Sequence, residues 1–340
     1  MTVQALSPHS IDDLLTWSRN TVDPHLRAAV DHLPEPLRHI CGYHFGWRDA
    51  SGKAVQGKPG KALRPALTLL TARAVGGDAA DAIPAAVAVE LAHNFSLLHD
   101  DVMDRDRTRR HQPTAWTVFG TSEAILAGDA LLAQASHTLA PAGGTAVQWL
   151  NDAVIELCQG QAQDLAFERR TDVVLDECVM MAQRKTSALL EVSCALGALA
   201  GGADEATVHL MRAFGRHLGL AFQLVDDLLG IWGSPSQTGK PAHSDLANRK
   251  KSLPVVAALT SKTPHGHALG QLYLTPAPPN TDDLGYLADL VEKAGGREWA
   301  STRATDEIEK AMDCLARAQC ERTTTATLHD IALHLTKRDH

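Results

Sequence analysis

The chain has 340 residues, an apolar fraction of 44% and a formal net charge of -8. This length and apolar content suit a globular protein with a substantial core. The acidic balance excludes general affinity for nucleic acids, because no basic excess is present to neutralise phosphates along a duplex. Aromatic residues make up only 4%, and β-branched runs are scarce among the many Ala and Leu residues, so we expect an all-α fold.

The N-terminal residues, MTVQALSPHSIDDLL, lack the basic and apolar regions of a signal peptide. No apolar run reaches the length that a membrane span needs. The six cysteines are scattered, with no CxxC pair and no spacing typical of zinc sites. We therefore expect a cytoplasmic protein with reduced thiols and no integral membrane segment.

Residues 42–65, GYHFGWRDASGKAVQGKPGKALRP, predict a cation-rich loop that leads into a helix beginning near Leu63. Further helix breaks are expected at 140–144, 233–245 and 275–283, where Gly, Pro, Ser and Asp cluster. Between the breaks, apolar residues recur with the period of a helix. Examples are Leu91, Phe95, Leu98 and Val102, and Phe214, Leu218, Ala221 and Val225.

The stretch HDDVMDRDRTRR, residues 99–110, combines aspartates with arginines. A helix running from about Pro84 through Val102 places Asp100 and Asp104 one turn apart on one face. Like charges at this spacing repel each other, so their pairing indicates a shared cation, for which Mg2+ is the natural candidate because it binds carboxylate and phosphate oxygens. Arg109 and Arg110 then suit the phosphate. Taken alone, such a charge run is also compatible with a solvated helix end.

A second acidic helix end occurs in GLAFQLVDDLLGIWG, residues 219–233, where Asp226 and Asp227 follow an apolar run and Gln223 lies one turn earlier. Two long antiparallel helices could bring both acidic ends to the mouth of one bundle. The pattern therefore predicts a site for a diphosphate and its metal ions, with apolar walls below it.

With these two acidic helix ends, the chain resembles the trans-isoprenyl diphosphate synthase (polyprenyl synthetase) family. It resembles most of all the bacterial geranylgeranyl diphosphate synthases of that family. The resemblance covers Gly60 to Pro254 and depends on ordered motifs. These are GKALRP (60–65), ELAHNFSLLHDDVMDRDRTRR (90–110), AILAGDALL (124–132), GQAQDL (160–165), KTSALL (185–190), FQLVDD (222–227), TGKP (238–241) and RKKSLP (249–254).

This resemblance implies a single domain over residues 1–340, a bundle of long, mostly antiparallel helices around a deep central cavity, with flexible ends at 1–20 and 324–340. It also implies a homodimer and two or three Mg2+ ions per site. The implied reaction condenses isopentenyl diphosphate with dimethylallyl, geranyl or farnesyl diphosphate. The allylic substrate loses diphosphate, the isopentenyl double bond attacks the resulting cation, and a proton is lost.

The resemblance also assigns roles to individual residues by position. It implies Asp100, Asp104 and Asp226 as the main metal ligands, with Asp101 and Asp227 supporting them. The implied contacts of the allylic diphosphate are Arg109, Lys185, Thr186, Gln223, Lys240 and Lys250, and those of isopentenyl diphosphate are Lys61, Arg64, His93 and Arg110. The residues expected to carry catalysis are Asp100, Asp104, Arg109, Lys185, Asp226 and Lys240.

Product length is expected to depend on Phe95 and Ser96. Phe95 lies five residues before Asp100, about 7 Å deeper along a helix. An aromatic residue at this position, with no insertion in DDVMD, resembles the family members that stop at twenty carbons. The expected product is therefore geranylgeranyl diphosphate.

Several residues, and the activity itself, allow more than one interpretation from the sequence. Gly230 stands where many relatives have a third aspartate, and His111 where glycine is frequent. His93 alone could be a core histidine, and Lys61 and Arg64 ordinary loop charges. The alternatives to chain elongation are a class I terpene cyclase on the same scaffold and a non-catalytic regulatory subunit of a heteromeric prenyl synthase.

Overall fold

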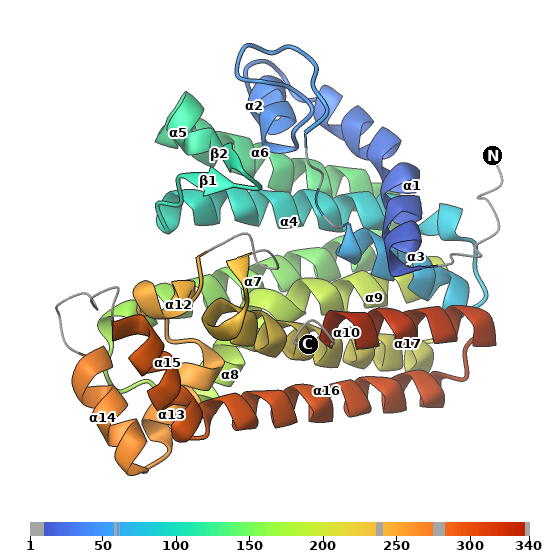
Figure 1. Ribbon diagram of the computed structural model, residues 1–340. Coiled ribbons are helices and arrows are strands. Elements are labelled where there is room, and N and C mark those ends of the chain that lie inside the picture. Colours follow the sequence, from blue (N-terminus) through green and yellow to red (C-terminus); the bar gives the residue numbers. More distant parts are fainter. Residues whose placement is uncertain (1–9, 58–59, 61, 236–240, 275–282, 337–340) are drawn as a thin grey trace. The chain divides into compact units, whose positions relative to one another are not determined.

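The computed structural model describes residues 10–57, 60, 62–235, 241–274 and 283–336 (Figure 1). Nearly all of the regular secondary structure in these residues is helical, which confirms the all-α prediction. Two short strands, β1 (Thr108–Arg109) and β2 (Gln112–Pro113), form a hairpin. The predicted residues Lys61 and Lys240 lie outside the described residues. None of the helices in the described ranges is both long and apolar enough to cross a membrane.

Two compact units make up the chain. The first contains the described part of Met1–Asp152 together with Val192–His209 and Cys320–Thr325, and the second contains Ala153–Glu191, Leu210–Gln319 and the described part of Ala326–His340. The expected single domain stays a prediction. The predicted flexible ends, 1–20 and 324–340, overlap two helices: the first contains the start of α1 (Ile11–Asp31) and the second most of α17 (Arg322–Thr336).

The first unit is organised around α4 (Ile83–Met103), which packs against α3 (Leu63–Ala74) and, along its length, against α6 (Thr121–Leu139) (Figure 1). Pro84 lies in the first turn of α4, where its missing N–H costs no hydrogen bond. The predicted start of α3 near Leu63 and the predicted extent of α4 are both confirmed. The remaining elements of this region are α2 (Leu37–His44), η1 (Ala79–Ala82), α5 (Ala115–Phe119) and η2 (Ala140–Ala142).

The second unit buries one face of α10 (Glu205–Trp232), whose apolar period was predicted. Leu220, Leu224 and Leu228 pack with residues of α8 (Leu175–Ala182), α13 (Leu253–Thr260) and α16 (Gly296–Ala318). This packing fixes the end of α10, which carries Asp226 and Asp227. The other elements are α7 (Gly144–Arg169), the π-helical turn η3 (Gln183–Ser187), α9 (Ala188–Ala200), α12 (Ser244–Ala247), α14 (Pro264–Tyr273) and α15 (Leu284–Lys293). Helices α7, α9, α10 and α17 contribute residues to both units.

Candidate active site

The first acidic helix end lies at the C-terminus of α4. The N–H of Asp104 donates to the carbonyl oxygen of Asp100 at 2.8 Å, so the two aspartates are one helical turn apart, as predicted. Asp104 is exposed and Asp100 half-buried, whereas Asp101 is only 1% exposed. The sequence therefore places two carboxylates toward solvent and a third one inside the protein.

Asp101 forms an ion pair with Arg109, whose Nε donates to Oδ1 at 2.8 Å. Burial raises the pKa of Asp101 to about 6, although the charge of Arg109 acts in the opposite direction. The other carboxylate oxygen, Oδ2, is buried and has no hydrogen-bond partner in the described part of the chain. An uncompensated buried oxygen is costly, so Oδ2 is suited to accept a further donor or a cation.

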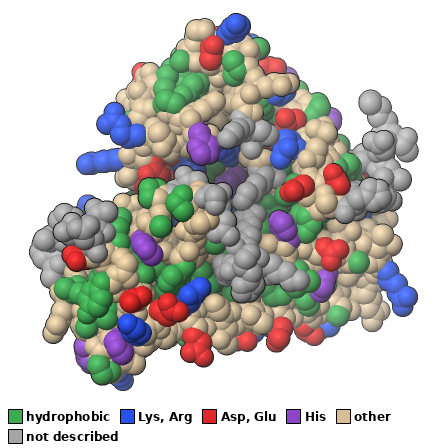
Figure 2. Space-filling view, viewed as in Figure 1, with side chains coloured by type: hydrophobic (Ala, Val, Ile, Leu, Met, Phe, Trp, Pro, Cys, Tyr) green, Lys and Arg blue, Asp and Glu red, His purple; other side chains and the backbone are tan. Residues whose placement is uncertain are grey.

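Arg109 and Arg110 are carried by the β1–β2 hairpin. Thr108 pairs with Pro113, and Arg109 pairs with Gln112. Arg110 and His111 are therefore the two turn residues, with φ of 52° and 66°. Such two-residue hairpins need positive φ at both central positions. Residues other than Gly, Asn and Asp adopt this backbone conformation only at a cost in energy. Figure 2 shows Lys and Arg side chains projecting at the edge that carries this hairpin. His111 thus occupies a strained position that glycine would fill without strain.

A half-buried cluster contains three of the residues expected to bind isopentenyl diphosphate. Burial, followed by the charges of Arg64 and Arg110, holds the pKa of His93 well below its usual range, so the imidazole is neutral. Burial lowers the pKa of Arg64 to about 10 although Glu90 raises it. Arg110 is also coupled to Glu90. The structure therefore brings Arg64, His93 and Arg110 into one electrostatic cluster.

Sequence reasoning missed three members of this cluster. Glu90 accepts a hydrogen bond from the Asn94 amide at 3.0 Å, and the amide oxygen of Asn94 contacts His44 Nε2 at 3.2 Å. Burial, with the charges of Arg110 and Arg109, lowers the pKa of His44 to about 3. Glu90 and Asn94 stand in the quoted ELAHN motif, so the sequence did contain a signal for them.

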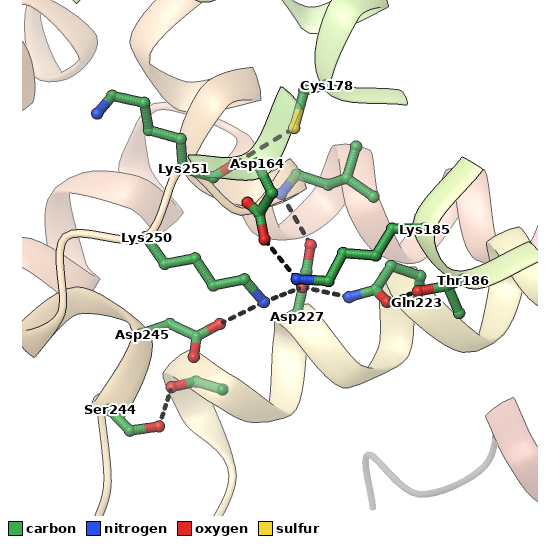
Figure 3. A network of polar contacts seen from close by, with 12 residues as sticks. Asp164, Cys178, Lys185, Thr186, Gln223, Asp227, Ser244, Asp245, Lys250 and Lys251 are labelled. Atoms are coloured by element: carbon green, nitrogen blue, oxygen red, sulfur yellow. Dashed lines mark hydrogen bonds and ion pairs between the residues drawn. The ribbon is translucent and has the colours of Figure 1, made fainter. Parts of the chain in front are cut away.

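The second acidic helix end places its two aspartates differently from each other. Asp226 is exposed, whereas Asp227 is 3% exposed. Oδ1 of Asp227 accepts from Gln223 Nε2 at 2.8 Å and from Lys250 Nζ at 3.3 Å, and Oδ2 accepts from the Leu253 N–H at 2.9 Å (Figure 3). Both oxygens are engaged by protein donors, and one of these bonds caps the N-terminus of α13.

The residues predicted to hold the allylic diphosphate join this network. Lys185 and Thr186 lie in the π-helical turn η3, an irregularity that is frequent at functional sites. Lys185 Nζ donates to Asp164 Oδ2 at 2.7 Å, and the Thr186 hydroxyl donates to the Gln223 side chain (Figure 3). Burial alone would lower the pKa of Lys250, but Asp227, Asp245 and other carboxylates raise it well above its usual range. The ammonium group of Lys250 therefore stays protonated.

Asp245 is a further residue that the sequence did not single out. Its Oδ2 lies 3.8 Å from Lys250 Nζ, and its carboxylate lies against the backbone of Gly230. A Cβ at position 230 would be 2.4 Å from Asp245 Oδ2. The space that the third aspartate of the second motif would enter is therefore taken by the carboxylate of Asp245, which arrives from a later segment.

The aspartates of each acidic helix end, taken separately, have the chemistry of magnesium ligands. Mg2+ takes hard oxygen ligands, often one or two carboxylates together with phosphate oxygens and water. Asp100, Asp104 and Asp226 offer such oxygens toward solvent, and Asp101 Oδ2 is buried without a described partner. In the part of the chain that the structure describes, no three His, Cys, Asp or Glu side chains converge as a ready metal cluster.

Phe95 and Ser96, the expected determinants of product length, are both buried, at 5% exposure each. The Ser96 hydroxyl donates to the His93 carbonyl oxygen at 2.8 Å, so it turns back onto its own helix. The ring of Phe95 contacts His99 edge to face, with 5.2 Å between ring centroids. Phe95 is thus held from one side by a defined neighbour.

Comparison with known proteins identifies the class. The model of the polyprenyl synthetase family matches residues 47–291. A (2E,6E)-farnesyl diphosphate synthase of Mycobacterium tuberculosis is 45% identical over 332 residues, covering 96% of this chain and 92% of its own. A geranylgeranyl diphosphate synthase of the same organism is also 45% identical, over 90% of this chain and 89% of its own. The crystal structure of a polyprenyl synthetase from Streptomyces coelicolor has a TM-score of 0.92 and 44% identity, covering 96% and 99% of the two chains.

The fold and the matches define an isoprenoid synthase of the all-α class. This chain belongs to the polyprenyl synthetase family, the trans-isoprenyl diphosphate synthases, and is a prenyltransferase of isoprenoid biosynthesis. The family is metal-dependent and acts on isoprenoid diphosphates. Relatives that are 40–45% identical to this chain are named for products of different length, so membership of the family does not fix the product.

Proposed function

We propose that this protein condenses isopentenyl diphosphate with an allylic diphosphate and releases geranylgeranyl diphosphate as its main product. The observation that carries the proposal is Phe95, a buried aromatic residue five positions before Asp100 in a helix that continues without insertion through Met103. A large ring at this depth leaves no room for a chain that grows past it. The relative named for farnesyl diphosphate makes a fifteen-carbon product the competing outcome.

We assign the metal ligands by the exposure of each aspartate. Asp100, Asp104 and Asp226 are each more accessible than Asp101 and Asp227, and we propose that they bind two or three Mg2+ ions of the allylic diphosphate. Bound Mg2+ would offset the negative charge that develops on the leaving diphosphate. Asp101 and Asp227 pair with Arg109 and Lys250, which supports a role in positioning these cations.

The cations then divide by substrate. Arg109, Lys185 and Lys250 are proposed to contact the allylic diphosphate with Gln223, while Thr186 lies beside its reacting carbon. Lys240 has the same assignment, and Lys61 is assigned to isopentenyl diphosphate. Arg64 and Arg110 would bind the isopentenyl diphosphate with two planar guanidinium groups, and neutral His93 would donate one hydrogen bond to it.

The test is product analysis by mass spectrometry. Purified protein is incubated with Mg2+, isopentenyl diphosphate and, in separate tubes, dimethylallyl, geranyl or farnesyl diphosphate. We expect products that end at twenty carbons from every allylic substrate. Phe95→Ala should extend them beyond twenty carbons. Ser96→Ala keeps a small side chain at the second position expected to affect length and removes only a hydroxyl bonded to its own helix, so it should leave them unchanged. Products ending at fifteen carbons in the wild type would overturn the assignment of length.

The same tubes separate elongation from the two alternatives. A hydrocarbon product without consumption of isopentenyl diphosphate would indicate a cyclase, and no turnover would indicate a subunit that needs a partner. We also propose a homodimer, supported by the exposed apolar side chains Ile125 and Leu126 on α6. Light scattering on the purified protein should give twice the mass of one chain, and a monomer mass would contradict it.

A further inference from the structure

His99 links the proposed length determinant Phe95 to the neighbouring helix α6. Phe95 and His99 lie one turn apart on α4, and their rings meet edge to face at 78°. On its other side, His99 Nε2 lies 2.9 Å from the carbonyl oxygen of Ile125 and 3.7 Å from Asp129 Oδ1, both on α6. The imidazole is therefore held between an aromatic ring and a helix backbone.

The hydrogen bond to Ile125 defines the orientation of the imidazole. A carbonyl oxygen only accepts hydrogen bonds, so Nε2 must carry the proton and donate it. Asp129 also offers only acceptor oxygens and lies on the same side of the ring. Both contacts favour one ring orientation, and the contact with Phe95 then has a fixed surface behind it.

Gly128 makes this arrangement possible. A Cβ at position 128 would lie 2.3 Å from His99 Nε2 and 2.4 Å from its Cδ2, well inside van der Waals contact. These are atoms of a ring that is itself held in place, so the ring would have to leave its position next to Ile125. Only glycine at position 128 lets the imidazole sit against α6 in this way.

We propose that His99 and Gly128 are positioning residues that set product length by holding the ring of Phe95. This inference rests on the proposed role of Phe95 as the residue that stops chain growth. Without the support of His99, the Phe95 ring gains rotational freedom, and the growing chain can pass it in a fraction of turnovers. The fold therefore uses a contact between α4 and α6, outside the aspartate motif, to keep the product uniform.

The experiment measures product length in full-length Gly128→Ala, His99→Gln and Phe95→Ala variants. All receive farnesyl diphosphate, isopentenyl diphosphate and Mg2+ at fixed concentrations and low conversion. We expect Gly128→Ala to raise the fraction of products beyond twenty carbons at least fivefold over wild type. His99→Gln keeps a donor for Ile125 but loses the ring, so it should broaden the distribution in the same way. Product length does not depend on how much enzyme is folded, so a merely destabilised variant would lose rate but keep its products.

Two comparisons make the result decisive. Gly270→Ala in α14 is the matched control, because a Cβ there would meet only Leu259 at 3.9 Å, and it should keep wild-type products. The double variant Gly128→Ala with His99→Gln should be no broader than His99→Gln alone, since Gly128 acts through His99. If Phe95→Ala lengthens products and the other two variants do not, this inference fails alone. If Phe95→Ala also changes nothing, the proposed role of Phe95 fails with it.

Discussion

The ends of α4 and α10 carry the same pair of aspartates but use the second one in different ways. Asp101 pairs through one oxygen with Arg109, and its other oxygen has no described partner. Asp227 uses both oxygens, for Gln223, Lys250 and the N-terminus of α13. In both motifs, however, the first aspartate is more accessible than the second. This difference supports the proposal that the first aspartate of each pair binds ligands, while the second holds neighbouring protein groups in place.

The largest effect is expected from the accessible aspartates. Asp100→Asn and Asp226→Asn each remove a carboxylate charge and keep nearly the same side-chain volume, so core packing is unchanged. If each supplies several kcal/mol of metal-assisted charge stabilisation, turnover should fall by about a thousandfold or more. Steady-state kinetics with matched unfolding curves would check this. Near-normal turnover in either variant would remove that residue from the metal site.

Glu307, a buried carboxylate outside both motifs, shows what a purely structural carboxylate contributes, and Asp227 can be compared with it. Glu307 is 2% exposed and lies 2.6 Å from His217 Nδ1, 2.9 Å from Lys310 and 3.0 Å from Arg303. Burial alone would raise the pKa of Glu307, but the hydrogen bonds of His217 and Lys310 and the charge of Arg303 lower it from 4.5 to about 2. This group therefore contributes stability above pH 4.5 that is lost as the pH falls toward 2.

The lowered pKa converts into an expected stability difference. Lowering the pKa of Glu307 from 4.5 to about 2 corresponds to about 3 kcal/mol of stability. Glu307→Gln should therefore lower the unfolding free energy at pH 7 by about this amount and flatten its fall between pH 4.5 and 2. Urea unfolding at several pH values, with exposed Glu309→Gln as control, measures the difference. Parallel pH curves for wild type and Glu307→Gln would show that the pairing contributes nothing.

Asp227 should resemble Glu307 in its effect on stability. Asp227→Asn leaves Lys250 without its nearest carboxylate and weakens the cap of α13, so the unfolding free energy should fall by about 2 kcal/mol. Turnover should fall by only about 10-fold to 100-fold, as for residues that orient a site without binding the metal. If the stability of Asp227→Asn is unchanged while its turnover falls as far as in Asp226→Asn, the proposed difference between the two aspartates is wrong.

The smallest effect concerns the hairpin of the first end. His111 has a φ of 66° and an exposed side chain, so His111→Gly relieves backbone strain. Allowing for the greater freedom of glycine in the unfolded chain, we expect a gain of about 0.5–1 kcal/mol. Thermal unfolding should show it as a small rise in Tm. A lower Tm would mean that the His111 side chain makes a stabilising contact.

The sequence predicted the first acidic end better than the second for a physical reason. Asp100, Asp104 and Arg109 are placed by one helix and the hairpin that follows it, so helical period and spacing suffice. Asp227 is organised by Lys250 and Leu253, which are 23 and 26 residues away along the chain. Asp245 reaches Gly230 from a later turn in the same way. Such contacts depend on tertiary packing, which no local pattern encodes.

The most direct test of this division of roles is a titration of bound Mn2+ by electron paramagnetic resonance, with inorganic diphosphate present. Wild type, Asp226→Asn and Asp227→Asn are compared as full-length proteins at pH 7. We predict that Asp226→Asn binds fewer Mn2+ ions, or binds them at least tenfold more weakly, while Asp227→Asn keeps the wild-type number. Loss of ions in Asp227→Asn with normal binding in Asp226→Asn would contradict it.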